Sequence, residues 1–445
     1  MSWYTLLVAN STKSELLRMK NKYWLILIIA FTTIARLWNL GNPKGYVFDE
    51  VYHAFTAKAY ANNDPRGYEW WHSSPEEGTA YEWLHPPVSK LFMGLSVYIL
   101  GENSFAWRLP SALFGVLVIY LIYLLGRELS GSDTVGLVAA GLSSLDGLLL
   151  VQSRVAMNDI YVTAFILASL LFYLKWRGQE NPKTQKIKKS NLYLLLSGIM
   201  TGLAIATKWT GVFLLPIVGA HSLYVWQQNK WKSWIKDLGR MIIVYGLMPV
   251  VIYVLSYSQF WLQGHTVSEF VELHSQIIRY QINLEATHPY QSKAWQWPLP
   301  VKPVWYSVDY SVEGRVGNIY ALSNPIVGWV GLMTIAFVGW RLVKSKKNRS
   351  SDLLLVLSYF LIWGPWMLSP RIMFYYHYTP AIPLLAIAMA IFFDWLWKRG
   401  ESSRGLVLGL VGLAVLAFVF FWPIWTLVPV DREFVEYFFW IPSWK

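Results

Sequence analysis

Two short polar strings lie next to apolar segments, in positions where they could do chemistry. Asp49 and Glu50 follow the first apolar run, and His85-Pro86-Pro87 comes before the next long one. Adjacent carboxylates at the water-facing end of a helical bundle suit the abstraction of a proton in a polar cleft. The sequence therefore predicts Asp49 and Glu50 as catalytic residues, with His85 on the same surface site.

Both strings also have a purely structural interpretation. Asp is a favoured helix N-cap, and acidic residues in the first turn complement the helix dipole, so Asp49 and Glu50 could simply begin a helix. Proline fixes its own φ and extends the residue before it, so His85-Pro86-Pro87 could be only a rigid turn. Spacing alone leaves the two interpretations open.

The composition indicates a membrane protein. Hydrophobic residues make up 55% of the chain and charged residues 14%, and apolar runs of roughly the 20 residues that cross a bilayer recur along it. These runs are too continuous for the alternating pattern of a barrel, and lone strands leave backbone groups unpaired in lipid. We therefore predict an all-α polytopic membrane protein that forms one integral domain over residues 1–445.

Eleven membrane spans are predicted. They cover residues 23–40, 107–126, 133–152, 159–175, 191–207, 209–227, 241–258, 324–341, 352–369, 372–394 and 405–427. An apolar stripe predicts a surface helix over 49–60. The apolar segment 88–100 is short, follows two prolines and carries Lys90, which fits an interfacial helix better than a span.

The basic residues predict how the chain is oriented. Six segments on one side of the predicted bundle hold about 78 of the 445 residues but 23 of the 38 Lys and Arg. Since cytoplasmic loops are enriched in these residues, the N-terminus should be cytoplasmic and the C-terminus outside. The first outer loop, 41–106, and the second, 259–323, then both face outward. Short basic turns near anionic lipid account for the net charge of +12 and argue against nucleic-acid binding.

The outward side also holds most of the histidines. Seven of the eight are predicted there: His53, His72, His85, His265, His274, His288 and His377. The chain has no Cys, which excludes thiolate catalysis, Cys metal sites and disulfides. Asp49 and His53 could share a metal from one helix face, but no further cluster completes such a site. We expect neither a metal nor another cofactor.

Cations on the same side predict an anionic ligand. They are Arg108, Arg154, Lys208 and Arg371, and His85 and His377 join them. Arg371 is the most informative, because a cation at a helix N-terminus opposes the dipole and calls for a counter-anion. Arg154 could instead pair with Asp159, and Lys208 could extend its ammonium group toward the membrane surface.

A carboxylate base and several cations beside the lipid phase suit a sugar carried on a lipid phosphate. The phosphate gains negative charge as the glycosidic bond breaks, so fixed Arg and Lys side chains would stabilise the transition state. The acceptor hydroxyl then needs a base, and Asp49 is the candidate.

The sequence resembles the protein O-mannosyltransferases, multispan enzymes of the dolichyl-phosphate-mannose-protein mannosyltransferase group with the C-type glycosyltransferase fold. The resemblance runs in family order through Phe48-Asp49-Glu50, His85-Pro86-Pro87, Arg108 to Gly115, Ser153-Arg154, Thr207-Lys208-Trp209, His288 to Ser292, Trp295 to Pro298, Asn324-Pro325 and Arg371 to Tyr378. Eukaryotic members carry a β-trefoil module of the MIR type in the second outer loop. Residues 259–323 are too few for it, so the resemblance is to the compact prokaryotic form.

The resemblance implies transfer of mannose from a polyprenyl-phosphate carrier to Ser or Thr of a protein crossing the membrane, with inversion at the sugar. It implies that Asp49 is the essential acid, Glu50 its neighbour and Arg108 an important arginine. The other candidates are given substrate-binding roles only because they lie on the predicted outward side and can carry positive charge. They are His85, Arg154, Lys208, Arg371 and His377. The expected partners are the polyprenyl-phosphate-mannose donor, an exported Ser/Thr-containing protein, membrane lipid and the protein translocation machinery. The expected location is the cell membrane.

Two other functions stay open. A related enzyme could hand a lipid-linked sugar to a lipid or a glycan, although the loop from His288 to Ser292 favours a protein acceptor. A transporter would be expected to show internal repeats and helices broken at the midplane of the bilayer, and neither is evident in the sequence.

Overall fold

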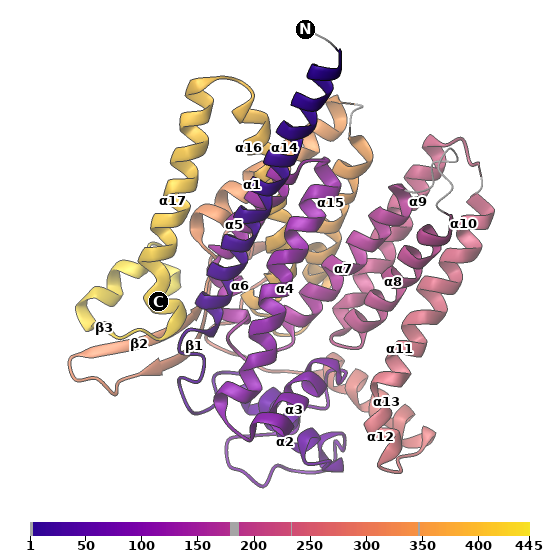
Figure 1. Ribbon diagram of the computed structural model, residues 1–445. Helices are drawn as coiled ribbons and strands as arrows, with labels where there is room; N and C mark the ends of the chain where they lie inside the picture. Colours follow the sequence, from indigo (N-terminus) through magenta and orange to yellow (C-terminus); the bar gives the residue numbers. More distant parts are fainter. Residues whose placement is uncertain (1–2, 179–186, 233, 346–347) are drawn as a thin grey trace.

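A bundle of helices makes up most of the protein. The computed structural model describes residues 3–178, 187–232, 234–345 and 348–445 (Figure 1). Among these residues, eight helical segments are long and apolar enough to cross a membrane: Ser104–Ser130, Asp159–Gly178, Trp209–Gln228, Trp234–Ser256, Pro325–Lys344, Arg349–Leu368, Tyr375–Trp397 and Glu401–Thr426. A mostly helical, multi-pass membrane protein is therefore confirmed.

Each of the eleven predicted spans coincides with one helix or with consecutive helices. The bundle consists of α1 (Trp3–Leu37), α4 (Ser104–Ser130), α5 (Asp133–Ser144) with α6 (Gly147–Gln152), α7 (Asp159–Gly178), α8 (Ile187–Ile205), η2 (Trp209–Phe213) with α9 (Leu214–Gln228), α10 (Trp234–Met241) with η3 (Ile242–Leu247) and α11 (Met248–Ser256), α14 (Pro325–Lys344), α15 (Arg349–Trp363) with η5 (Gly364–Leu368), η6 (Tyr375–Ala381) with α16 (Ile382–Trp397), and α17 (Glu401–Thr426). α7 and α16 are the most buried of the eight long segments, so they form the centre of the bundle.

The predicted span 133–152 is interrupted by a buried carboxylate. α5 ends at Ser144, and Asp146 begins α6 by accepting a hydrogen bond from the Leu149 amide at 2.9 Å. The second oxygen of Asp146 accepts a bond from the Asn324 amide at 3.0 Å, where α14 begins. One side chain thus satisfies the free amides of two helix starts. The chain then turns through Arg154 and enters α7 at Asp159.

Shorter helices and the strands gather at the end of the bundle away from the N-terminus (Figure 1). They are α2 (Glu50–Ala61), η1 (Pro65–Gly67), α3 (Val88–Leu100), α12 (Ser258–Leu262), α13 (Val267–Asn283), η4 (Ala294–Gln296), η7 (Arg432–Phe438), η8 (Pro442–Trp444) and three strands. The predicted helices over 49–60 and 88–100 are therefore confirmed as helices. Gly94 lets α3 lie close to α2, since a Cβ there would stand 2.9 Å from the Ala57 carbonyl oxygen.

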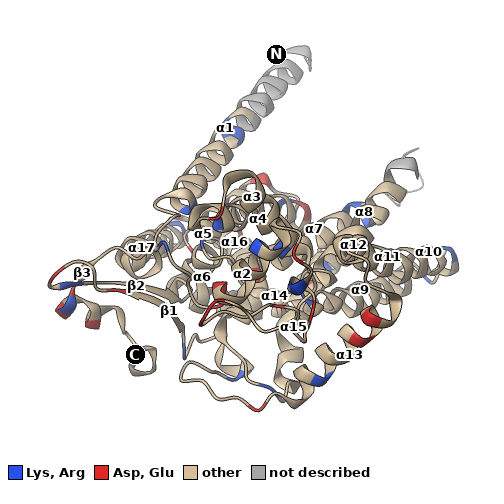
Figure 2. Cartoon of the chain, turned by 90° about the horizontal axis from the view of Figure 1, so that it is seen from below, with Lys and Arg blue, Asp and Glu red and all other residues tan. Residues whose placement is uncertain are grey.

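The two loops predicted to face outward lie against each other. The Gln259 side-chain amide donates to the Tyr60 carbonyl at 2.9 Å, and the His265 ring lies 3.1 Å from Glu69. In the view onto this end, charged residues appear on α13 and around α2 (Figure 2). The loops 41–106 and 259–323 therefore build one surface, and its outward orientation stays a prediction.

A small antiparallel sheet departs from the all-α prediction. β1 (Val304–Asp309) pairs with β2 (Arg315–Ala321), with Val304 opposite Ala321, and β2 pairs with β3 (Val430–Asp431) near the C-terminus. The ladder is irregular between Trp305 and Ser307, which leaves Tyr306 in a bulge. The prediction of a purely helical fold is wrong at this point, because hydropathy over long windows does not detect two short strands.

The arrangement predicts where residues on opposite ends of the bundle can be reached. Cys introduced at Ser73, in the first loop, and at Ser345, which follows α14, should react with a membrane-impermeant thiol reagent from opposite sides. The native chain has no Cys, so each variant carries a single thiol. The measurement is labelling in intact and in permeabilised cells. Labelling of both positions in intact cells would contradict the arrangement.

Candidate functional site

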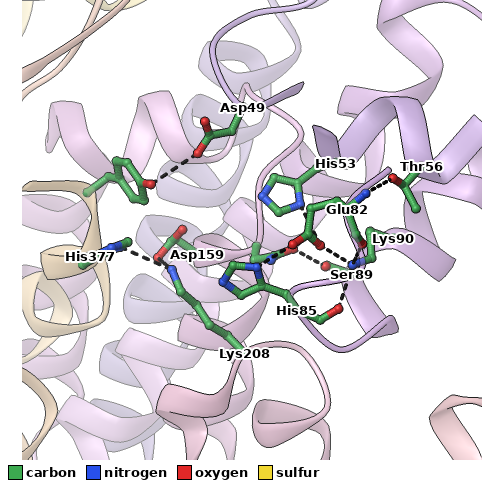
Figure 3. Close-up of polar contacts among 12 residues, drawn as sticks. Asp49, His53, Thr56, Glu82, His85, Ser89, Lys90, Asp159, Lys208 and His377 are labelled. Carbon is green, nitrogen blue, oxygen red and sulfur yellow. Dashed lines mark hydrogen bonds and ion pairs between the residues drawn. The ribbon is translucent and has the colours of Figure 1, made fainter. Parts of the chain in front are cut away.

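Asp49 lies at the start of α2 but does not cap it. Its side chain makes no hydrogen bond with the helix amides. The carboxylate instead accepts a hydrogen bond from the Tyr376 hydroxyl, 3.2 Å away on η6 (Figure 3). The N-cap interpretation of Asp49 therefore does not describe its side chain. The carboxyl group faces across the end of the bundle, toward the segment that follows Arg371.

The surroundings of Asp49 favour a carboxyl group that exchanges a proton near neutral pH. Burial raises its pKa to about 7, against the hydrogen bond from Tyr376 and the charge of Lys208, both of which lower it. A general base works best when its pKa lies close to the working pH. The residue as a whole is only partly buried.

Glu50, the next residue, has a different environment. It is fully buried, and the Arg108 guanidinium donates to both of its oxygens, at 2.8 and 2.7 Å. The same oxygens accept bonds from the amides of Val47 at 2.8 Å and Ala156 at 2.9 Å. Since all of these bonds use its lone pairs, Glu50 has no capacity left to take a proton from a substrate. The contacts favour a structural role.

Arg108, the partner of Glu50, also binds backbone groups. Beyond Glu50, its guanidinium donates to the backbone carbonyls of Pro43 at 2.7 Å and Gly45 at 2.9 Å. The side chain is buried with 1% of its surface exposed. Arg108 therefore holds the loop that leads into Asp49, and its described contacts are to protein groups rather than to an open cleft.

Arg154 is also engaged with the backbone. One nitrogen donates to the carbonyls of Ala35, Arg36 and Trp38 at the end of α1, at 3.1, 3.0 and 2.6 Å. These are carbonyls that a helix C-terminus leaves unpaired. The alternative of an Arg154 to Asp159 pair is not formed. Arg154 caps α1, and its predicted role in substrate binding stays a prediction.

Lys208 and His377 lie together near Asp49. The Lys208 ammonium group is 2.8 Å from Asp159 and 3.4 Å from Nδ1 of His377 (Figure 3). The His377 ring stacks on Trp366 with centroids 4.4 Å apart. Lys208 is buried rather than extended toward the membrane surface. The structure thus brings two of the predicted ligand-binding residues into contact.

A second charged cluster holds His85. Nδ1 of His85 lies 2.7 Å from Glu82, whose amide donates to the Thr56 hydroxyl at 2.6 Å. The fully buried Lys90 pairs with the Glu82 carboxylate and donates to the carbonyls of Glu82 and His85 at 2.7 and 2.8 Å. Burial raises the pKa of Glu82, but the charges of Lys90 and His85 outweigh it and hold that pKa well below its usual range. Glu82 is therefore ionised and fixes the His85 ring.

Sequence reasoning missed Glu82 and Tyr376 as members of the site. Glu82 stands three residues before His85, and Lys90 stands five residues after it. This close spacing of an acid and a base around His85 could have indicated the cluster. Tyr376 lies in a run of aromatic residues that resembles a membrane interface belt, and nothing in that pattern singles out one hydroxyl.

Arg371 is the predicted cation that remains open. It is partly buried, and its Nε atom has no hydrogen-bond partner among the described residues. No ion pair of Arg371 occurs in that part of the chain either. A cation in such a position is available to an anionic ligand. No group of three or more described His, Asp or Glu residues is placed to hold a metal ion, and metal-free catalysis stays a prediction.

Comparison with known proteins identifies the family. Residues 26–265 match the dolichyl-phosphate-mannose-protein mannosyltransferases, and residues 266–444 match the C-terminal four-span region of protein O-mannosyltransferases. The chain belongs to the protein O-mannosyltransferase family. The resemblance seen in the sequence is confirmed, and with it the prediction of a glycosyltransferase.

Relatives of this mannosyltransferase match over nearly its whole length. The polyprenol-phosphate-mannose-protein mannosyltransferase of Mycolicibacterium smegmatis is 26% identical over 94% of this chain and 92% of its own. Among solved structures, the Saccharomyces cerevisiae Pmt1-Pmt2 complex bound to the sugar donor has a TM-score of 0.80 at 15% identity, covering 96% and 93% of the two chains. ArnT from Cupriavidus metallidurans bound to undecaprenyl phosphate has a TM-score of 0.58 at 17% identity, covering 88% and 63%. The two structures share the fold.

The buried pair of Glu50 and Arg108 predicts a loss of stability in one variant of this mannosyltransferase. Arg108→Ala should lower the free energy of unfolding by about 3–5 kcal/mol, because it leaves a buried carboxylate without its partner. The measurement is thermal or denaturant unfolding in detergent. The matched control is Arg315→Ala, which removes an exposed pair with Asp431 and should change stability by at most about 1 kcal/mol. A normal melting temperature with lost turnover in Arg108→Ala would instead indicate that Arg108 contacts the substrate.

Proposed function

We propose that this protein transfers mannose from a polyprenyl-phosphate-mannose donor to Ser or Thr hydroxyls of exported proteins, inverting the anomeric centre, with Asp49 as general base. The observation that carries the proposal is the Asp49 side chain, which is free of its helix and faces Tyr376 and Lys208. The name of the Mycolicibacterium relative and the donor bound in the yeast complex support the choice of substrates.

The chemical step needs only groups that lie at this site. Asp49 takes the proton of the acceptor hydroxyl while that oxygen attacks the anomeric carbon from the face opposite the phosphate. The bond between the anomeric carbon and the phosphate oxygen breaks, and its electron pair leaves with the phosphate. Fixed cations aimed at this developing charge lower the barrier more than they favour the ground state.

The cations differ in how well they fit the role of phosphate ligand. Arg371 has no protein partner among the described residues, whereas Lys208 already pairs with Asp159. His85 is held by Glu82, which leaves its second nitrogen for a ligand. We assign Arg371 as the main phosphate ligand, with Lys208, His377 and His85 as supporting groups. Arg108 and Arg154 do not bind the phosphate in this proposal. They hold the backbone around the site through their bonds to Glu50 and to main-chain carbonyls.

The proposed topology places the reaction outside the cytoplasm. All eleven helical segments cross the membrane, the N-terminus is cytoplasmic, and the C-terminus and the active site are extracytoplasmic. The 23 basic residues on the opposite side support this orientation. Residues 1–445 then act as one integral domain, and the site meets a translocating chain as it leaves the translocation machinery.

The first prediction from this function concerns the base. Asp49→Asn should reduce transfer to a Ser/Thr peptide by about 10²–10⁴-fold, because an amide cannot accept the proton. Thermal unfolding and binding of the lipid-phosphate donor should stay near wild type, since the side chain keeps its size and can still accept the Tyr376 bond. Asp64→Asn, the same change in the same loop, is the control and should retain activity.

The pH profile gives a further readout for Asp49. Turnover of the wild type should fall as pH drops through about 7, since protonation removes the base. An Asp49→Asn enzyme that folds and transfers mannose at near the wild-type rate would remove Asp49 from the mechanism. Transfer to a lipid acceptor in place of the peptide would favour the related lipid-modifying reaction.

The second prediction concerns the leaving group. Arg371→Ala should lower turnover by about 10²-fold or more if the guanidinium contacts the phosphate in the transition state. Arg371→Lys should recover only part of the loss, because Lys keeps the charge but not the bidentate fork. Arg279→Ala, an exposed arginine on α13 at the same end, is the control. Wild-type turnover in Arg371→Ala would leave this residue as an interfacial anchor.

A further inference from the structure

Phe48, the residue before the proposed base, has an unusual backbone conformation. Its φ is +49°, in the left-handed region that bulky L-residues rarely adopt. Such a conformation persists only where the surrounding structure holds it, and residues of this kind cluster at functional sites.

Aromatic rings enclose the Phe48 side chain. Tyr306 stacks on it with centroids 4.4 Å apart and an angle of 9° between the rings. His288, Phe374 and Tyr376 meet it edge-on, with centroids at 6.4, 6.2 and 5.9 Å. These rings come from the second loop and from the segment around η6, so two distant parts of the chain converge on Phe48.

The stacked partner is itself anchored. The hydroxyl of Tyr306 accepts a hydrogen bond of 2.6 Å from the Gln152 side chain at the end of α6. Tyr306 also lies in the bulge of β1, where the irregular ladder turns its side chain toward Phe48. On the other side of Phe48, the Val47 amide is bound to Glu50. The backbone before Asp49 is thus fixed from both sides.

We propose that Phe48 and Tyr306 form a clamp that keeps the backbone before Asp49 left-handed and so aims the carboxylate at Tyr376. Tyr376 couples the two features, because its ring packs against Phe48 while its hydroxyl binds Asp49. In this arrangement Phe48 is a positioning residue that acts through Asp49. The inference rests on the proposed function, since it concerns how the proposed base is held.

The test begins with two substitutions that differ in backbone freedom. Phe48→Ala should lower kcat by about 10²-fold with the donor KM nearly unchanged, because small misplacements of a reacting group have effects of that order. Phe48→Gly also lacks the ring but adopts positive φ without a steric penalty, so it should retain about tenfold more turnover than Phe48→Ala. A residue that merely fills space would lower the yield of folded enzyme and would not produce this order in kcat.

The second part tests the stacked partner. Tyr306→Phe keeps the ring and should retain about tenfold more turnover than Tyr306→Leu, which removes the stack. If the two rings act as one clamp, adding Tyr306→Leu to Phe48→Ala should cause little further loss. Should Phe48→Ala fail to fold, the comparison of Tyr306→Phe with Tyr306→Leu carries the same test.

Two results would overturn the clamp. One is a folded Phe48→Ala enzyme with kcat close to wild type, and the other is a double variant in which the two losses multiply. Neither depends on the base assignment: an inactive Asp49→Asn together with a fully active Phe48→Ala rejects the clamp alone. An active Asp49→Asn rejects the proposed function itself.

Discussion

The buried ion pair between Glu50 and Arg108 is the contact on which the candidate site depends. It joins α4 to the first turn of α2, and through further hydrogen bonds it holds the loop before Asp49 and the turn before α7. A buried pair adds little net stability compared with apolar residues of the same size, because both charges lose their hydration. Its value here is geometric. The hydrogen bonds of the two side chains tie together the backbone at Val47, Pro43, Gly45 and Ala156.

Neighbouring acids consequently have opposite properties. Glu50 is surrounded by donors that leave it no free lone pair, whereas Asp49 has one hydrogen bond from Tyr376 and a pKa raised to about 7. The same chemical group becomes an anchor in one environment and a proton acceptor in the other. The φ of Phe48 contributes to the difference, because it determines the direction in which the chain presents Asp49.

Much of the fold could be predicted from the sequence, because the spans depend on local hydropathy. The partners of charged residues could not. The alternative to substrate binding for Arg154 was a pair with Asp159, five residues away, but Lys208 takes that carboxylate and Arg154 caps α1. Which basic residue pairs with a given carboxylate depends on which helices pack together, and a local sequence pattern does not show this. The hairpin of β1 and β2 did leave a signal, since Val304, Tyr306 and Val308 alternate and Gly314 lies in the turn, but a search for long apolar runs passes over it.

The distribution of charge around Asp49 bears on the kind of ligand that fits. Glu50, Glu82 and Asp159 are each neutralised by a basic residue, so these groups add little net charge to the site. Asp49 and Arg371 are left without an ionic partner among the described residues. In the proposed reaction, a phosphate that binds Arg371 supplies the missing anion, and the proton that Asp49 accepts neutralises the remaining carboxylate. Each of these two groups then gains its counter-charge from the substrates.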